Sequence, residues 1–240
     1  MPAWGNALPS RAERSELKRS SIILEAARSF NRTGFYGTSM ADIAQRLGVT
    51  KAALYRYVPN KHDVLFACFN IAMDSSFASI ERADKQGANG LEKVRIALRG
   101  YLEDLIGTLG HPVVLLEENA LLPEQARAVI RRRDEAERRY RGFIKEGVED
   151  GSIIPCDPKL AVFALMGAIN WVPKWYRDDG DWSAAEVAES LVDMILRSIS
   201  ARPENLRNGL KSRERRGPDR TGIVPPRTDE EPHTIDRRTK

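Results

Sequence analysis

Apolar residues near the start of the chain recur at steps of three and four, the spacing that places them on one face of an α-helix. Ile22, Ala26 and Phe30 form this face, with arginines between them, and Gly34 ends the helix. From residue 64 to residue 201 the same spacing recurs, and no alternation of apolar and polar residues competes with it. The pattern therefore predicts an all-α protein.

Two short helices follow the first. Ser39 begins one of them, because its hydroxyl can accept a hydrogen bond from the amide three residues on, and Gly48 ends it. Thr50 can cap the next, over residues 51–57, which Pro59 stops because proline has no amide hydrogen for a further turn. Two short helices joined by a glycine-containing turn are typical of a helix-turn-helix unit, whose second helix enters the DNA major groove. The alternative is a helical bundle with a solvated basic face.

The residues of this unit closely resemble the DNA-binding domain of the tetracycline-repressor (TetR) family. The matching segments are GFYGTSMADIA (34–44), LGVTKAALYRY (47–57) and Asn60-Lys61, and the resemblance covers most of residues 14–70. The family usually has an aromatic residue where this chain has Val58. The resemblance implies DNA contacts at Ser39, Thr50, Lys51, Ala52, Tyr55, Tyr57 and Lys61, with Arg56 beside them.

Glycines and prolines divide the remainder into helices expected at 61–84, 89–109, near 113–120, 123–150, 158–176 and 183–200. The family resemblance implies that they form an effector-binding and dimerisation domain. Residues 160–169 are apolar on every side of a helix, so the segment must be buried all round, and residues 183–199 are amphipathic. By family analogy, these last two helices of each subunit form a four-helix bundle in a homodimer. The alternative is that both pack within a monomer.

Charge supports a division of the 240 residues. The whole chain carries a net charge of only +4, but residues 1–64 carry 10 basic and 5 acidic side chains, residues 65–202 carry 18 and 22, and residues 203–240 carry 10 and 7. A basic part joined to an acidic one indicates that the first contacts an anionic polymer. We expect a flexible arm (1–12), a DNA-binding domain (13–64, motif 39–58), a helical effector domain (65–202) and a disordered charged tail (203–240).

The segment from Asn170 to Arg177 resembles the penultimate-helix signature of a TetR subgroup that often responds to acyl-CoA thioesters. That resemblance places Asn170 and Trp171 beside an elongated pocket and Lys174 or Arg177 on the CoA phosphates. Asp178 and Asp179 depart from the subgroup pattern and oppose a phosphate site, so an apolar or aromatic acid and a cationic drug stay open. Tryptophans that cap the core are a further alternative. Other expected pocket residues are Leu102, Ile106, Asn119, Tyr140, Phe143, Phe163 and Met166.

Other classes of protein find little support. Cys68, Cys156 and the three histidines are not at the spacing of metal ligands, and no catalytic motif or resident cofactor is indicated. No continuous apolar run of about 18 residues indicates a membrane span, so the expected compartment is the cytoplasm. We expect a DNA-binding regulator, a repressor released from a palindromic operator by a small-molecule effector. The alternatives are an architectural DNA binder without effector control and an enzyme with an incidental basic domain.

Overall fold

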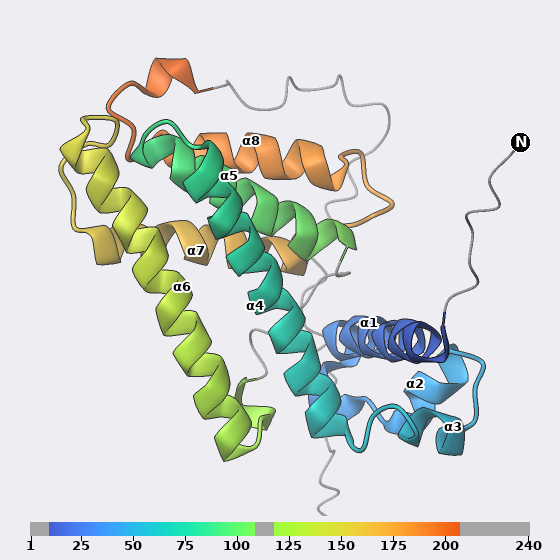
Figure 1. Ribbon diagram of the computed structural model, residues 1–240. Coiled ribbons are helices and arrows are strands. Elements are labelled where there is room, and N and C mark those ends of the chain that lie inside the picture. The colour runs from blue at the N-terminus through green and yellow to red at the C-terminus, as the bar shows by residue number, and fades with distance from the viewer. Residues whose placement is uncertain (1–9, 109–117, 207–240) are drawn as a thin grey trace, which may run out of the picture. The chain divides into compact units, whose positions relative to one another are not determined.

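The computed structural model describes residues 10–108 and 118–206, and within these ranges the protein is all-α apart from one isolated bridge between Ile153 and Ser200 (Figure 1). This confirms the predicted fold class. The elements are α1 (Arg11–Gly37), α2 (Met40–Arg46), α3 (Lys51–Tyr55), α4 (Lys61–Gln86), α5 (Gly90–Glu103), the π-helical turn η1 (Asp104–Thr108), the 3-10 turn η3 (Glu118–Ala120), α6 (Pro123–Glu149), α7 (Pro158–Trp175), α8 (Ala184–Leu196) and the 3-10 turn η4 (Pro203–Asn205).

Local signals in the sequence set most helix ends. Gly34 breaks α1 as predicted, with a φ of 75° that an L side chain rarely adopts. The Ser39 hydroxyl accepts from the amide of Asp42 at 3.1 Å, and Thr50 accepts from the amide of Ala53 at the same distance. The recognition helix is shorter than predicted, because α3 ends at Tyr55 and the next two residues form a turn.

Both ends of the described chain are more ordered than expected. Ser10 caps α1 in a reciprocal capping box with Glu13, so residues 10–12 are not a flexible arm. The expectation of a disordered tail is wrong for residues 203–206, since Leu206 is buried and its carbonyl accepts from Arg197 at 2.7 Å. The rest of the predicted tail, most of the predicted arm and the greater part of the helix expected near 113–120 lie outside the described residues.

Two apolar clusters hold the protein together. The N-terminal core comprises the buried side chains of α1, α2, α3 and the first part of α4, with Ala120, Leu121 and Val129 added from η3, the next turn and α6. The C-terminal core comprises buried side chains of the second part of α4 and of α5, η1, α6, α7 and α8. Helix α4 runs unbroken through the expected domain boundary at residue 64. It is long and apolar enough to cross a membrane by composition, but 56% of that window is buried, as in a core helix.

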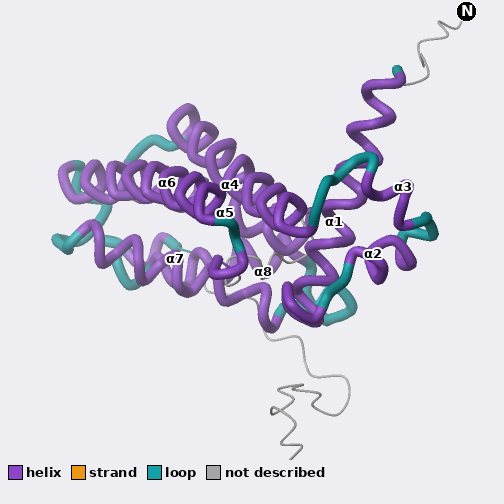
Figure 2. Tube along the Cα trace, turned by 90° about the horizontal axis from the view of Figure 1, so that it is seen from below, coloured by secondary structure: helices purple, strands orange, loops and turns teal. Residues whose placement is uncertain are grey.

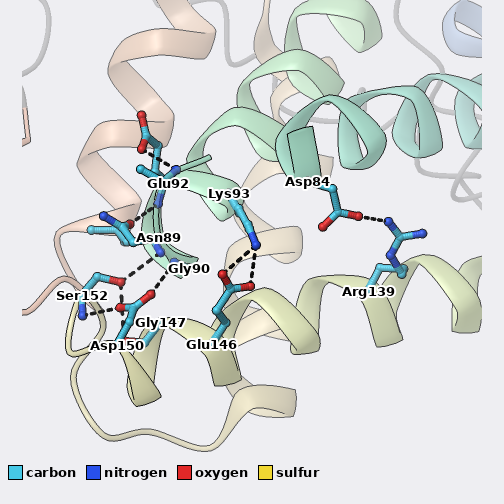
Figure 3. A network of polar contacts seen from close by, with 12 residues as sticks. Asp84, Asn89, Gly90, Glu92, Lys93, Arg139, Glu146, Gly147, Asp150 and Ser152 are labelled. Atoms are coloured by element: carbon cyan, nitrogen blue, oxygen red, sulfur yellow. Dashed lines mark hydrogen bonds and ion pairs between the residues drawn. The ribbon is translucent and has the colours of Figure 1, made fainter. Parts of the chain in front are cut away.

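The start of α5 meets the end of α6 in a polar network (Figure 3). The amide of Gly90 donates to the Asp150 carboxylate at 2.8 Å, and Lys93 donates to Glu146 at 2.6 Å. Burial raises the pKa of Asp150, but hydrogen bonds from Ser152 and Gly90 outweigh it and hold that pKa below its ordinary value. These contacts satisfy amides at the α5 N-terminus and fix the position of two helices that bear on the cavity described below.

Candidate DNA interface and effector cavity

The outer face of α3 is free of the cores. Leu54 is fully buried against the N-terminal core and fixes the rotation of the helix. That rotation leaves five neighbouring side chains exposed, which are Thr50, Lys51, Ala52, Tyr55 and Arg56. Small and hydrogen-bonding side chains on a protruding helix can approach base edges and phosphates, and Ser39 is exposed at the start of α2.

Two of the expected DNA contacts, Lys61 and Tyr57, also make contacts within the protein. The Lys61 ammonium donates to the carbonyls of Phe35 and Thr38 at 2.8 and 2.9 Å and lies 4.1 Å from the centre of the Phe35 ring. These bonds use two of its three N–H groups, so Lys61 holds the turn between α1 and α2. Tyr57 is half-buried against the N-terminal core, with the Lys18 ammonium 6.0 Å from its ring centre. DNA contact by either residue stays a prediction, and their first role here is structural.

One exposed aromatic was missed. Tyr36, near the end of α1 after the break at Gly34, is 78% exposed and packs edge-on against Phe35 at 5.3 Å between ring centres. Its position between Gly34 and Gly37 in the family-like motif was the available signal.

A cavity of about 710 Å³ lies between α4, α5, α6 and α7, a size typical of sites for small molecules. Its inner wall is lined by Met73, Ser76, Tyr101, Ala136, Tyr140, Val162, Phe163, Met166, Gly167 and Asn170. Its charged mouth, all but Lys159 supplied by α6, consists of Arg133, Asp134, Glu137, Arg138, Arg141 and Lys159.

Four of the expected pocket residues line this cavity: Tyr140, Phe163, Met166 and Asn170. Leu102, Ile106 and Phe143 do not line it and are buried in the C-terminal core. Asn119, Trp171, Lys174 and Arg177 are exposed and lie outside this cavity, so nothing here supports a contact between them and a ligand in it. Lys174 and Trp171 are on another face of α7, while Arg177 follows the helix and pairs with Asp179 at 2.8 Å.

Two tyrosine hydroxyls make the inner wall polar at defined points. The Tyr101 hydroxyl donates to Asn170 at 3.4 Å. The Tyr140 hydroxyl faces Ser76 but makes no well-formed hydrogen bond to any part of the chain that the structure describes. Burial raises the pKa of both tyrosines well above the ordinary value, so both are donors at neutral pH. A ligand oxygen at the Tyr140 hydroxyl would satisfy an otherwise costly buried group.

The mouth has four cationic side chains and two anionic ones. Glu137 pairs with Arg141 at 2.9 Å, one of the ion pairs that the spacing along α6 permitted. None of the six charged residues of the mouth was among the expected pocket residues. Across residues 10–108 and 118–206, no three His, Cys, Asp or Glu side chains are arranged to hold a metal ion.

Helix α7 has a third, exposed face beside its core and cavity faces. It carries Leu160, Ala164, Trp171 and Trp175, and Met194 of α8 is exposed as well. One side of residues 160–169 is exposed within this single chain, where Leu160 is 67% exposed, so the expected burial on every side stays a prediction that needs a second subunit. An exposed apolar stripe of this kind marks a surface for association.

A protruding short helix on a compact N-terminal core and a cavity in a separate helical core define a DNA-binding regulator with a small-molecule site. Family comparisons agree. Residues 22–68 match the model described as bacterial regulatory proteins of the tetR family, and residues 87–199 match the tetracyclin repressor-like C-terminal domain. The chain belongs to the TetR family of transcriptional regulators.

Several relatives are covered over nearly their whole length. The TetR-family regulator PfmR from Thermus thermophilus is 33% identical, with 73% of this chain and 97% of that chain covered and a TM-score of 0.65. AibR in complex with isovaleryl coenzyme A and operator DNA is 30% identical, with 73% and 97% covered and a TM-score of 0.60. The repressor KstR2 of Mycobacterium tuberculosis is 24% identical, with 76% and 93% covered.

Proposed function

We propose that this protein is a homodimeric repressor that reads a palindromic operator through α3 and leaves it when an amphipathic anion enters the cavity. The observation that supports DNA reading is the exposed face of α3 on a buried Leu54 anchor. Tyr55 and Lys51 are the principal contacts of this face, with Arg56 on the adjoining phosphates. A regulator that binds an operator works in the cytoplasm of a bacterial cell.

We infer a dimer because one short recognition helix contacts too few base pairs to distinguish an operator from other DNA. The exposed apolar face of α7, from Leu160 to Trp175, together with Met194 of α8, is the surface we assign to it. Two copies related by a two-fold axis would present their recognition helices about 34–36 Å apart, or a multiple of that, and so read two half-sites.

The effector class rests on the cavity. An apolar inner wall with a donor at Tyr140 suits a hydrophobic group bearing an oxygen, and a mouth with more cations than anions suits phosphate or carboxylate. An acyl-CoA thioester combines both, and AibR has been solved with isovaleryl coenzyme A. In this proposal Arg138 and Lys159 take the role that sequence analysis assigned to Lys174 and Arg177.

Release requires the effector to prefer the protein in the conformation that does not fit DNA. Met73 and Ser76 of α4 line the cavity, and the same helix begins at Lys61 against the turn before the DNA-reading unit. A ligand that shifts α4 would therefore change the spacing of the two α3 helices.

The DNA assignment is tested with Tyr55→Ala and Lys51→Ala on an operator selected from random duplexes. Each substitution should weaken operator binding at least tenfold, as expected for a lost base or phosphate contact. Lys145→Ala, an exposed lysine near the end of α6, is the control and should bind as the wild type does. Unchanged affinity in both α3 variants would refute this recognition surface.

The effector assignment is tested by thermal shift with isovaleryl-CoA, octanoyl-CoA and the free acids, followed by operator release. Lys159→Ala should weaken the stabilisation by the CoA thioesters, whereas Lys174→Ala, on the same helix but outside the cavity, should not. If both variants lost the same amount of thermal stabilisation by the CoA thioesters, Lys159 would not be a residue of the effector site. Stabilisation by free acids alone would exclude the thioester.

A further inference from the structure

The first three turns of α1 have no packing role. Helix α1 begins at Arg11, but its buried residues start only at Ile22, and Leu17 in the leading part is 61% exposed. The TetR family match begins at residue 22, so this extension precedes the DNA-binding domain that the family model describes. Figure 2 shows it projecting beyond the other helices near α3. Because most helical stability in proteins comes from burial, an unpacked helical extension calls for another explanation.

Three of the four cationic residues of this extension share one side of the helix, and the fourth, Arg19, lies towards the side of Glu16. Arg11, Arg14 and Lys18 are three and four residues apart, which places them on one face of the helix, and we call them the basic stripe. Glu13 and Glu16 lie on the far side at about 100° per residue. Glu13 is engaged by the amide and hydroxyl of Ser10, and neither arginine of the stripe pairs with a carboxylate of residues 10–108 or 118–206.

The basic stripe starts beside the recognition helix. The ammonium of Lys18 lies 6.0 Å from the centre of the Tyr57 ring, and Tyr57 follows the last residue of α3 by only two positions. From Lys18 the stripe continues for about 10 Å along the helix to Arg11, at about 1.5 Å per residue. Arg56, one of the exposed residues of the outer face of α3, directly precedes Tyr57 in the sequence. Cationic side chains therefore occur on both sides of Tyr57, at Arg56 and at Lys18.

We propose that Arg11, Arg14 and Lys18 bind phosphates of the DNA backbone next to the bases that α3 reads. The proposal rests on the DNA-reading role of α3 and adds a second contact made by a different helix. Arginine and lysine bind phosphate by charge and hydrogen bonding and convey no base preference from that position. The extension should therefore raise affinity for every DNA sequence by the same factor and should leave the choice of operator to α3.

The test is the salt dependence of binding by the full-length protein to two duplexes of equal length, the selected operator and a random sequence. The logarithm of the binding constant falls as the logarithm of the salt concentration rises, and each lost phosphate contact makes this slope less steep by about 1. Arg11→Ala/Arg14→Ala should thus lower the slope by about 4 in a dimer, because each subunit loses two contacts. Affinity at low salt should fall at least tenfold on both duplexes, so that their ratio is unchanged.

Two control variants separate a local contact from a general loss of charge. Lys85→Ala/Lys145→Ala removes the same charge from exposed positions; Lys85 lies about 36 Å along α4 from Lys61, and this pair should leave the slope unchanged. Arg11→Lys/Arg14→Lys should retain most of the wild-type slope. Since neither arginine is buried, the thermal midpoint of every variant should match the wild type.

An unchanged slope in Arg11→Ala/Arg14→Ala, or an equal fall in Lys85→Ala/Lys145→Ala, would overturn the proposal. Failure of the recognition surface gives a different result. If Tyr55→Ala and Lys51→Ala left operator preference intact while the arginine variant lowered the slope, the basic stripe would stand and α3 would lose its role.

Discussion

The DNA-reading unit and the effector cavity are built in opposite ways. The expected DNA contacts lie between residues 39 and 61, on short helices whose ends are set by neighbouring side chains. The cavity is lined by four helices, from Met73 to Asn170, and its walls meet only when α6 packs near α4 and α7. A site made of consecutive residues can be identified from local pattern, whereas a site made by packing depends on contacts far apart in the chain.

The two regions also differ in what stabilises them. The N-terminal core is the smaller of the two, and helix caps such as Thr50 and Asn89 occur in both regions. The C-terminal core adds close backbone packing at Gly90 and Gly147 and a buried ion pair, in which Arg95 meets Asp193 at 2.6 and 3.0 Å. Substitutions at these contacts of the C-terminal region should therefore lower the free energy of unfolding more than substitutions at helix caps of the N-terminal region.

The largest effect is expected at Gly90. A Cβ there would lie against backbone atoms of Gly147 and Phe143, well inside van der Waals contact, so the helices must move apart. Gly90→Ala should lower the free energy of unfolding by about 3 kcal/mol or more, measured by urea denaturation with tryptophan fluorescence. Gly142→Ala is the control, because a Cβ there meets nothing within 4 Å, and helix propensity should make it neutral or stabilising. Equal changes in the free energy of unfolding for Gly90→Ala and Gly142→Ala would contradict the close approach of the backbone at Gly90 to Gly147.

The buried ion pair should give the next largest effect. Asp193 is 1% exposed, and its loss leaves the Arg95 guanidinium partly buried without its carboxylate partner. Asp193→Asn should destabilise the protein by about 3 kcal/mol in the same measurement. Asp179→Asn, in the exposed pair with Arg177, should cause no measurable change. A small loss at Asp193 would contradict a substantial contribution of this ion pair to stability.

The contact between the two regions should give a smaller effect. His62 lies 2.8 Å from the carbonyl of Ala120, and Gln125 donates to Asp63 at 2.8 Å. His62→Ala/Gln125→Ala should lower stability by about 1–2 kcal/mol through the lost hydrogen bonds. It should also separate the unfolding transitions seen by circular dichroism and by tryptophan fluorescence, since Trp171, Trp175 and Trp182 belong to the C-terminal region. Coincident transitions would show that these two hydrogen bonds are not needed to couple the two cores.

The smallest effect is the titration of a helix cap. Hydrogen bonds from the Ser39 side chain and amide hold the pKa of Asp42 below its ordinary value. The folded state thus favours the ionised form, so this stabilisation is present above the ordinary pKa and is lost as pH falls through the lowered one. Ser39→Ala should raise the Asp42 pKa towards its ordinary value in an NMR titration, while the pKa of distant Asp150 stays unchanged. If the Asp42 pKa stayed below its ordinary value in Ser39→Ala, a group other than the Ser39 side chain would be responsible for lowering it.

The cavity shows where local pattern stops being sufficient. Tyr140, Phe163, Met166 and Asn170, which were expected to line a pocket, line the cavity. Phosphate binding was expected at Lys174 or Arg177, which lie outside the cavity, whereas Arg138, which lines it, was not among the expected pocket residues. Lys174 and Arg138 are both charged residues on helices, and the sequence does not say which of them lies beside a cavity.

Caps, glycine turns and apolar spacing act over a few residues, so the helices, most of their ends and the family-like DNA-reading unit can be predicted from the sequence. The tertiary structure was needed to show which faces of α6 and α7 form the cavity and which face of α7 remains exposed. It also showed that Lys61 holds a turn and that the basic stripe starts beside Tyr57. Periodicity tells which side chains share a face of one helix, but the neighbour that this face meets is set by packing across the whole chain.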